Sequence, residues 1–288
     1  MKTENSESYV LHLPQQHVQP LVFDSPHSGM VLPADFAPLA SVSQMKTGWD
    51  AFVDELWQPS TEQGAAVLAA TVSRMYIDLN RAPDDIPHIM LEGAWPTALN
   101  PTAYSERGMG LLRQWALPGQ AMYAKPLAVK DVQQRLARYY QPYHQRLKQL
   151  LDQRHQEFGA VWHVDCHSMK SKGNAMNIDA GTARADFVIG NRDGESASAG
   201  FTNVIVESLQ AMGYQVSLNQ PYKGGYLTQC YANPTQRRHS IQIEINRHLY
   251  MDESGFSKHL GFVELQRNLQ LLTTNMLAYI EADLCSVF

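Results

Sequence analysis

The sequence predicts an α/β protein, with a single domain of three α/β/α layers around a mixed, largely parallel central sheet. Short apolar strand candidates alternate with segments of helical spacing along the chain, which is typical of this fold class. The 288 residues contain no break in composition, no internal repeat and no low-complexity segment. We therefore expect one domain over residues 1–288, in which residues 1–19 form a polar N-terminal extension or an edge segment.

The first half of the chain predicts four regular elements and two irregular segments. Apolar residues at helical spacing predict a helix that Pro59 and Gly64 end, and the segment before residue 125 is rich in Pro and Gly. Long loops of that kind often line active sites. In order, we expect a strand at 21–23, a loop at 24–29, a helix at 50–58, strands at 65–70 and 72–79, and loops with short helical pieces at 82–125.

The second half begins with the strongest helical pattern of the chain. Pro142 lies inside this helix and should kink or split it. A buried strand follows, with Cys166, His167 and Ser168 at its carboxyl end. In order, we expect a helix at 131–158, a strand at 160–165, a polar loop at 170–184, a strand at 186–189, a turn at 190–194, a helix at 201–212, strands at 214–218 and 240–245, and a closing helix at 262–280.

Bulk composition excludes several classes of protein. The net charge is -5 and there is no basic tract, which argues against nucleic-acid binding. No apolar stretch reaches the roughly 18 residues that a membrane span needs. The polar N-terminus lacks the apolar core of a signal peptide. Only three cysteines occur, which argues against a disulfide framework, so we expect a cytoplasmic protein. We also expect a monomer or a small homo-oligomer.

The run from Ser73 to Arg81 is the most informative segment. It alternates like a strand, with Met75, Ile77 and Leu79 on one face and polar residues on the other. Arginine suits carboxylates and oxyanions, so Arg74 and Arg81 suggest a site for an acidic small molecule. The structural alternative is that these arginines pair with neighbouring acids. A straight strand would also place Arg74 and Arg81 roughly 20 Å apart at about 3.3 Å per residue.

Candidate metal ligands also lie near strand ends. A catalytic zinc site usually takes three His, Asp or Glu ligands and leaves one position for water. His27 follows the first strand in a Pro-His-Ser-Gly loop, Asp50 opens a helix, and His167 ends a strand. His163 and Asp165 alternate with His167 and are rival ligands or hydrogen-bonding supports. Each signal alone also fits a structural residue, and no H-E-x-x-H or paired C-x-x-C motif is present.

Other segments suggest a base and further cations. Glu244 alternates with isoleucines on an apolar strand, where a carboxylate either pairs with an arginine or acts as a base with a raised pKa. Cys166 neighbours His167, but adjacent strand residues face opposite ways, so a nucleophilic dyad does not follow. The Gly-rich turns around Arg192 and Lys223 match no phosphate loop, though both cations could contact an anion.

Together these motifs resemble the N-formylglutamate amidohydrolase family. The resemblance spans about residues 20 to 280, and the motifs occur in the family's order. It implies a fold like that of the zinc carboxypeptidases and aspartoacylases, a phosphorylase/hydrolase-like α/β arrangement. The matching segments are Ser-Pro-His-Ser-Gly at 25–29, Ser-Arg-Met-Tyr-Ile-Asp-Leu-Asn-Arg at 73–81, Val-Asp-Cys-His-Ser at 164–168, Tyr-Lys-Gly-Gly-Tyr at 222–226, His-Ser-Ile-Gln-Ile-Glu-Ile-Asn-Arg at 239–247 and Tyr-Met-Asp-Glu at 250–253.

The resemblance implies one Zn²⁺ per chain and hydrolysis of N-formyl-L-glutamate to formate and L-glutamate. His27 and His167 match the first and last zinc ligands. Zinc carboxypeptidases carry the middle, acidic ligand three residues after the first histidine, but Met30 stands there in this chain. Asp50 matches an aspartate of the family and is the expected middle ligand, with Glu55 as the alternative.

The resemblance also implies roles for the remaining polar residues. Arg74 would polarise the scissile carbonyl, Asn80 and Arg81 would hold the substrate carboxylate, and Glu244 would activate the water. Compared with the deformylases of histidine degradation, the chain departs after Ser171. An apolar, proline-bearing loop is expected there, whereas this chain has Lys-Gly-Asn-Ala-Met-Asn-Ile-Asp at 172–179. That loop should approach one end of the substrate.

Two other functions remain open from the sequence. One is a zinc amidase or peptidase that acts on a different acyl amino acid or a short peptide. The other is a non-catalytic protein that binds small anions with the same arginines. All three readings share a small acidic ligand and no nucleic-acid or membrane partner.

Overall fold

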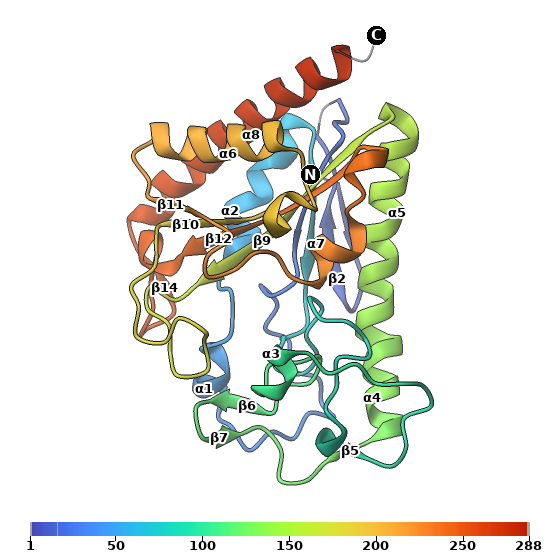
Figure 1. The fold of residues 1–288 in the computed structure, drawn as a ribbon. Coiled ribbons are helices and arrows are strands. Elements are labelled where there is room, and N and C mark those ends of the chain that lie inside the picture. The colour runs from blue at the N-terminus through green and yellow to red at the C-terminus, as the bar shows by residue number, and fades with distance from the viewer. Residues whose placement is uncertain (1, 16, 287–288) are drawn as a thin grey trace.

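The computed structural model describes residues 2–15 and 17–286, and an eight-stranded mixed sheet runs through its centre (Figure 1). Its strand order is β1-β2-β4-β3-β9-β12-β10-β11. The four central strands β4, β3, β9 and β12 are parallel to one another. The α/β class and the mixed sheet are therefore confirmed. The strands are β1 (Thr3–Asn5), β2 (Tyr9–His12), β3 (Leu21–Ser25), β4 (Ala66–Ala70), β9 (Val161–Met169), β10 (Phe187–Gly190), β11 (Val216–Leu218) and β12 (Arg238–Asn246).

At both edges of the sheet, short strands add antiparallel pairs to the parallel core. β2 pairs antiparallel with β4 and β1 with β2, so part of the segment 2–15 forms one edge. β10 pairs antiparallel with β12, and β11 pairs parallel with β10 at the other edge.

Helices cover one face of the sheet with a large apolar core. The helical elements on this face are α2 (Val53–Trp57), the 3₁₀ turn η1 (Gln58–Gln63), α6 (Ala199–Ala211) and α8 (Gly261–Cys285). Alternate strand residues point into this layer; Phe23 on β3, for example, stacks on Trp57 of α2 with ring centroids 4.8 Å apart. The intervening Val22 points into the opposite layer. The central strands are therefore buried on both faces, which explains their nearly continuous apolar sequence.

A long helical segment covers the opposite face, at the right of Figure 1. It consists of α4 (Val129–Arg135), a π-helical turn η3 (Leu136–Tyr140) and α5 (Gln141–Phe158), and α7 (Tyr226–Tyr231) packs nearby. Pro142 lies in the first turn of α5, directly after the π turn. Because proline cannot donate the usual hydrogen bond, the wider turn accommodates it without ending the helical path. The sequence therefore identified the irregularity, and the structure shows its form.

The predicted strand at 72–79 is wrong. Only Val72 forms an isolated bridge, to Val31, and the residues after it form turns in which the N–H groups of Tyr76 and Ile77 both point to the carbonyl oxygen of Ser73. The preceding strand β4 already has β2 and β3 as partners, so no free edge remains beside it. Tyr76 is also buried, so the apparent polar face does not contact solvent.

The segment 82–125 forms irregular loops with short elements, as the sequence predicts. Together with α1 it forms a layer below the sheet in Figure 1. Among the described residues no helix combines the length and apolar character needed to cross a membrane. The remaining short elements are α1 (Val42–Lys46), η2 (His88–Met90), β5 (Leu91–Glu92), α3 (Ala103–Glu106), β6 (Trp115–Leu117), β7 (Gln120–Ala121), β8 (Leu127–Ala128), η4 (Arg192–Gly194), η5 (Pro234–Gln236), η6 (Arg247–Leu249), β13 (Met251–Asp252) and β14 (Ser257–Lys258).

Candidate active site

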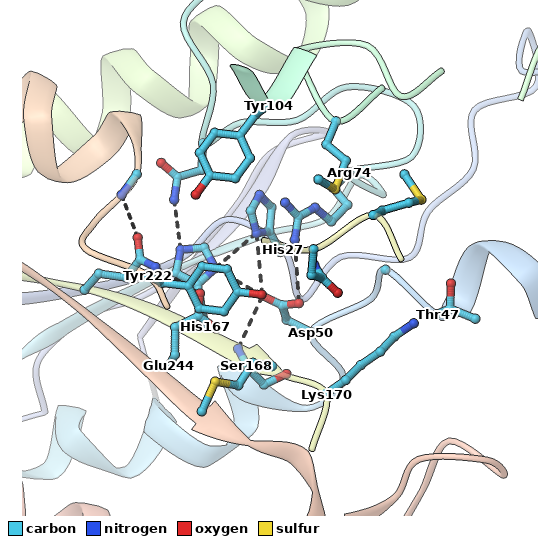
Figure 2. Close-up of a pocket in the computed structure, with 18 of the residues that line it drawn as sticks. His27, Thr47, Asp50, Arg74, Tyr104, His167, Ser168, Lys170, Tyr222 and Glu244 are labelled. Atoms are coloured by element: carbon cyan, nitrogen blue, oxygen red, sulfur yellow. Dashed lines mark hydrogen bonds and ion pairs between the residues drawn. The ribbon is translucent and has the colours of Figure 1, made fainter. Parts of the chain in front are cut away.

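A pocket opens at the carboxyl ends of the central parallel strands (Figure 2). His27 follows β3 by two residues, and His167 and Glu244 lie near the ends of β9 and β12. Glu244 and His167 are direct neighbours in the parallel ladder, so their side chains emerge on the same face. Asp50 precedes α2, and its backbone N–H bonds the carbonyl oxygen of His27. Strand geometry brings His27, His167 and Glu244 to one cavity, and the backbone hydrogen bond to His27 holds Asp50 beside them.

His27, Asp50 and His167 converge inside this pocket. The Nδ1 atoms of the two histidines are 3.0 Å apart. Oδ2 of Asp50 lies 3.1 Å from Nδ1 of His167 and 3.5 Å from Nδ1 of His27. Ligands bound 2.0–2.1 Å from a tetrahedral zinc lie roughly 3.3 Å from one another, so these separations match the spacing of zinc ligands. All three residues are at least 98 % buried.

Carboxylates hold the outer nitrogens of both histidines. Nε2 of His27 lies 2.6 Å from Oδ1 of Asp78, and Nε2 of His167 lies 2.7 Å from Oδ1 of Asp165. When each Nε2 carries a hydrogen for its carboxylate, both Nδ1 lone pairs point toward Asp50. The two Nδ1 atoms and the Asp50 carboxylate are then three acceptors that face one another with no hydrogen between them. A metal ion bound by all three would remove their mutual repulsion. The donor set therefore fits a metal ion.

The electrostatics of this group agree with that fit. Burial disfavours a charged imidazole, but the carboxylates of Asp165 and Asp50 outweigh it and raise the pKa of His167 well above its usual range. Burial also opposes the charge of Asp50, yet His167, His27 and Arg74 hold the pKa of Asp50 well below its usual range. The surroundings of His27, Asp50 and His167 thus favour a positive charge between these side chains, and a bound metal cation would supply it.

Asp50 rather than Glu55 stands in this group. Glu55 lies at the surface and pairs with Lys258. The second oxygen of Asp50, Oδ1, accepts a hydrogen bond of 3.0 Å from Nη2 of Arg247. His163, the other rival ligand, lies away from the pocket and bonds Asp24 and Ser240. Their positions in the structure therefore distinguish Asp50 from Glu55 and His163, the alternatives that the sequence left open.

Arg74 lies beside the group. Its Nε and Nη2 atoms donate to Oδ2 of Asp78 at 3.1 and 2.8 Å, and its Nη1 lies 3.7 Å from Oδ1 of Asp50. Because the chain turns between residues 73 and 81, Arg74 and Arg81 line the same pocket. The separation of roughly 20 Å expected for a strand therefore does not apply.

Glu244 lies in the same pocket without an arginine partner within ion-pair distance among the described residues. Arg247 binds Asp50, and Arg238 pairs with Asp152. Burial raises the pKa of the Glu244 carboxyl to about 7, and Asp50 adds to the effect while His167 opposes it. A carboxyl group with such a pKa is suited to accept and return a proton near neutral pH.

Comparisons with known proteins show the family of this chain. The model of a family described as N-formylglutamate amidohydrolase matches residues 19–251. The chain belongs to this family. It is 31% identical over 240 residues to an N-formylglutamate deformylase of Pseudomonas aeruginosa, covering 82% of this chain and 84% of that protein. It is 30% identical over 246 residues to an N-formylglutamate deformylase of Pseudomonas putida, covering 82% and 83%.

Solved structures extend the comparison. A crystal structure of an N-formylglutamate amidohydrolase from Ralstonia eutropha is 41% identical, with a TM-score of 0.92 over 96% of this chain and 99% of that chain. A gene product of Agrobacterium tumefaciens, 18% identical, has a TM-score of 0.64 over 95% and 96% and shows the shared fold alone. The expectation of an amide-hydrolysing enzyme is therefore confirmed at the level of the family.

Within the pocket, Asn80 and Arg81 lie differently from one another. Nδ2 of Asn80 donates to Asp165 and lies 2.9 Å from Nε2 of His167, while its Oδ1 accepts from the N–H of Leu227. Arg81 donates to the carbonyl oxygens of Asn80 and Met109. Asn80 is thus occupied by protein partners, whereas Nη2 of Arg81 has no hydrogen bond with the described residues.

The Tyr-Lys-Gly-Gly-Tyr segment approaches Asn80 closely. A Cβ on Gly225 would lie 2.5 Å from Oδ1 of Asn80, and Gly224 adopts a φ of +117°. Lys223 lines the pocket, but its ammonium group is exposed and pairs with Asp193 at 3.0 Å. Arg192 is not among the residues that line this pocket. The structure therefore brings together every predicted site residue except Arg192.

Sequence reasoning missed several residues of the site. Asp78, one of the acids that neighbour Arg74 and Arg81 in the sequence, supports His27. Gln242 donates from Nε2 to Oε1 of Glu244 at 2.9 Å, and its position two residues earlier on the same strand face was the available signal. Arg113 and Lys170 also line the pocket, and no sequence pattern distinguished them.

Proposed function

We propose that this protein hydrolyses N-formyl-L-glutamate to formate and L-glutamate, with one zinc ion held by His27, Asp50 and His167. The convergence of the two Nδ1 atoms and the Asp50 carboxylate carries this proposal. The names of the relatives support the substrate, and the cationic pocket suits a dicarboxylate. We take the further detail of a zinc-carboxypeptidase-like single domain as part of the same proposal.

A zinc ion in this position supplies a Lewis acid, which lowers the pKa of a water molecule toward about 7 and polarises a carbonyl. The protein supplies the proton transfers. Glu244 removes a proton from the water that attacks the formyl carbon, and it later delivers that proton to the amide nitrogen as the C–N bond breaks. One carboxyl group thus serves as base and then as acid.

Arg74 stabilises the oxygen that gains charge during the attack. Asp78 fixes its guanidinium through two hydrogen bonds, so its remaining donors are oriented before the substrate arrives. Arg81 binds a carboxylate of the substrate with a guanidinium whose orientation two backbone carbonyls determine. Asn80 holds Asp165, the carboxylate beside His167, rather than contacting the substrate.

An activity assay of the metal-free and the zinc-loaded protein tests this function. The purified protein is stripped with a chelator, reconstituted with Zn²⁺ and offered N-formyl, N-acetyl and N-succinyl amino acids. We expect one zinc per chain, loss of activity in the stripped protein, recovery on reconstitution and a clear preference for N-formyl-L-glutamate. Absence of zinc binding after reconstitution, or release of N-formylglutamate unchanged by the zinc-loaded protein, would overturn the proposal.

A further inference from the structure

The pocket contains more positive charge than its own acids neutralise. Four of its cations have carboxylate partners: Arg74 with Asp78, Arg247 with Asp50, Arg184 with Asp179 and Lys223 with Asp193. Three others, Arg81, Arg113 and Lys170, also line the pocket and lack a comparably close carboxylate among the described residues.

Arg113 is a buried guanidinium with an incomplete set of partners. It is 7% exposed, and its ion pair is a long contact of 3.4 Å from Nη2 to Oδ2 of Asp78. Arg74 approaches that same oxygen at 2.8 Å, so Asp78 is already engaged. The Nε of Arg113 is buried and has no hydrogen-bond partner in residues 2–15 and 17–286. A buried donor without an acceptor is costly, which points to an acceptor that arrives with the substrate.

Lys170 presents a second cation in the same pocket. It follows β9 directly, three residues after His167, and forms no ion pair or hydrogen bond through its ammonium group with the described residues. In Figure 2 its side chain extends toward Thr47, on the other side of the metal-binding group from Tyr222 and Glu244. Burial and the nearby charge of Arg247 lower the pKa of Lys170 to about 8, with smaller contributions from Arg184 and Arg113, while the Glu253 carboxylate opposes the effect.

We propose that Arg113 and Lys170 together bind the side-chain carboxylate of the substrate, while Arg81 binds its α-carboxylate. The inference rests on the proposed function and assigns the residues that select an acidic side chain. Arg81 lines the same pocket as His167 and Glu244, and we assign it to the position beside the reacting amide. The α-carboxylate is attached to the carbon that bears the amide nitrogen and must also lie there.

The side-chain carboxylate lies farther along the substrate and needs a more distant cation. Lys170 extends away from Glu244 and meets that need (Figure 2). Arg113 adds buried donors, and a carboxylate bound between the two cations would satisfy the unpartnered Nε. The pocket should therefore discriminate glutamate from glutamine by charge rather than by size.

Three matched substrates test the assignment: N-formyl-L-glutamate, N-formyl-L-glutamine, which lacks the side-chain charge, and N-formyl-L-isoglutamine, which lacks the α-carboxylate charge. The variants are Lys170→Met and Arg113→Met. Lys172→Met is the control, because Lys172 lies on the same loop but is exposed and outside the pocket. Metal content and thermal unfolding are measured for each variant.

For Lys170→Met we expect kcat/KM for the formylglutamate and formylisoglutamine substrates to fall about 10- to 100-fold, the usual range for a lost hydrogen bond to a charged group. Its kcat/KM for formylglutamine should change less than about threefold. Arg113→Met should show the same selectivity with zinc retained, and Lys172→Met should match the wild type.

An equal loss on all three substrates, or a loss confined to the two substrates that carry the α-carboxylate, would overturn the assignment while leaving the proposed function intact. Failure of the zinc-loaded wild type to cleave any of the three substrates would instead overturn the proposed function, and the inference with it.

Discussion

Oδ1 of Asp78 lies 2.6 Å from Nε2 of His27, and the other oxygen of this carboxylate receives two hydrogen bonds from Arg74. One buried side chain thus orients both a candidate metal ligand and the candidate oxyanion donor. The coupling means that a change at Asp78 should disturb metal binding and turnover together.

Asp78→Asn should weaken zinc binding about 10- to 100-fold, the usual effect of removing a carboxylate that supports a metal-bound histidine. The amide keeps the size of the side chain but loses the charge that holds His27 and Arg74. Competition with a zinc chelator measures the affinity. Asp152→Asn is the control, since Asp152 pairs with Lys148 and Arg238 at the surface. Unchanged zinc affinity in Asp78→Asn would contradict the supporting role.

Asn80→Ala tests whether Asn80 serves the metal group or the substrate. Its amide contacts Asp165 and His167, so we expect lower zinc affinity, with KM nearly unchanged once zinc is saturating. A large rise in KM at saturating zinc would instead support the role in carboxylate binding that the sequence resemblance implied.

Arg74→Ala and Arg81→Ala should separate turnover from binding. Arg74 faces the group where the oxyanion would form, so its loss should lower kcat on the order of 10²–10³-fold. Arg81 should contribute to binding of the substrate carboxylate, and its loss should mainly raise KM. Steady-state kinetics of both zinc-loaded variants give the comparison. The division of roles fails if Arg81→Ala lowers kcat as strongly as Arg74→Ala.

Glu244→Gln should retain zinc and lose activity by at least about 10²-fold, because the amide cannot accept the proton. Gln242 is its hydrogen-bond partner and can also bond a glutamine, so the local structure should persist. Zinc analysis and circular dichroism accompany the assay. Activity within a few-fold of the wild type would rule out Glu244 as the base.

The pH profile should also report on Glu244. Only its deprotonated form accepts a proton, and burial raises its pKa to about 7. A divalent cation nearby favours the carboxylate, so the zinc-loaded enzyme should have an acid limb in kcat/KM with its midpoint at or below about 7. Activity should therefore rise with pH through this range. Measurements at constant zinc saturation exclude metal loss, and an activity that falls between pH 5 and 7 would contradict the assignment.

The sequence predicted the central architecture because each layer carries its own periodicity. The apolar strands around Phe23 and Val164 are buried on both faces, and the long helix before Gly159 has a continuous apolar stripe. The alternation at residues 73–81 predicted a strand that does not form. Met75, Tyr76 and Ile77 are buried, but they lie in turns rather than in a strand. Periodicity alone cannot show that β4 already has a partner on each side.

For the site, the sequence by itself indicated which residues lie near strand ends, and so it identified His27, His167 and Glu244 as candidates, together with Asp50 at the start of a helix. Only the tertiary structure decided their partners. Asp165 lies two residues before His167 on β9, so the sequence could suggest its supporting role. Asp78 and Arg113 reach the site from separate segments, and contacts between segments leave no period in a sequence. The identity of strand-end residues is a local property of the chain, whereas the charge balance of the pocket depends on how distant loops fold over it.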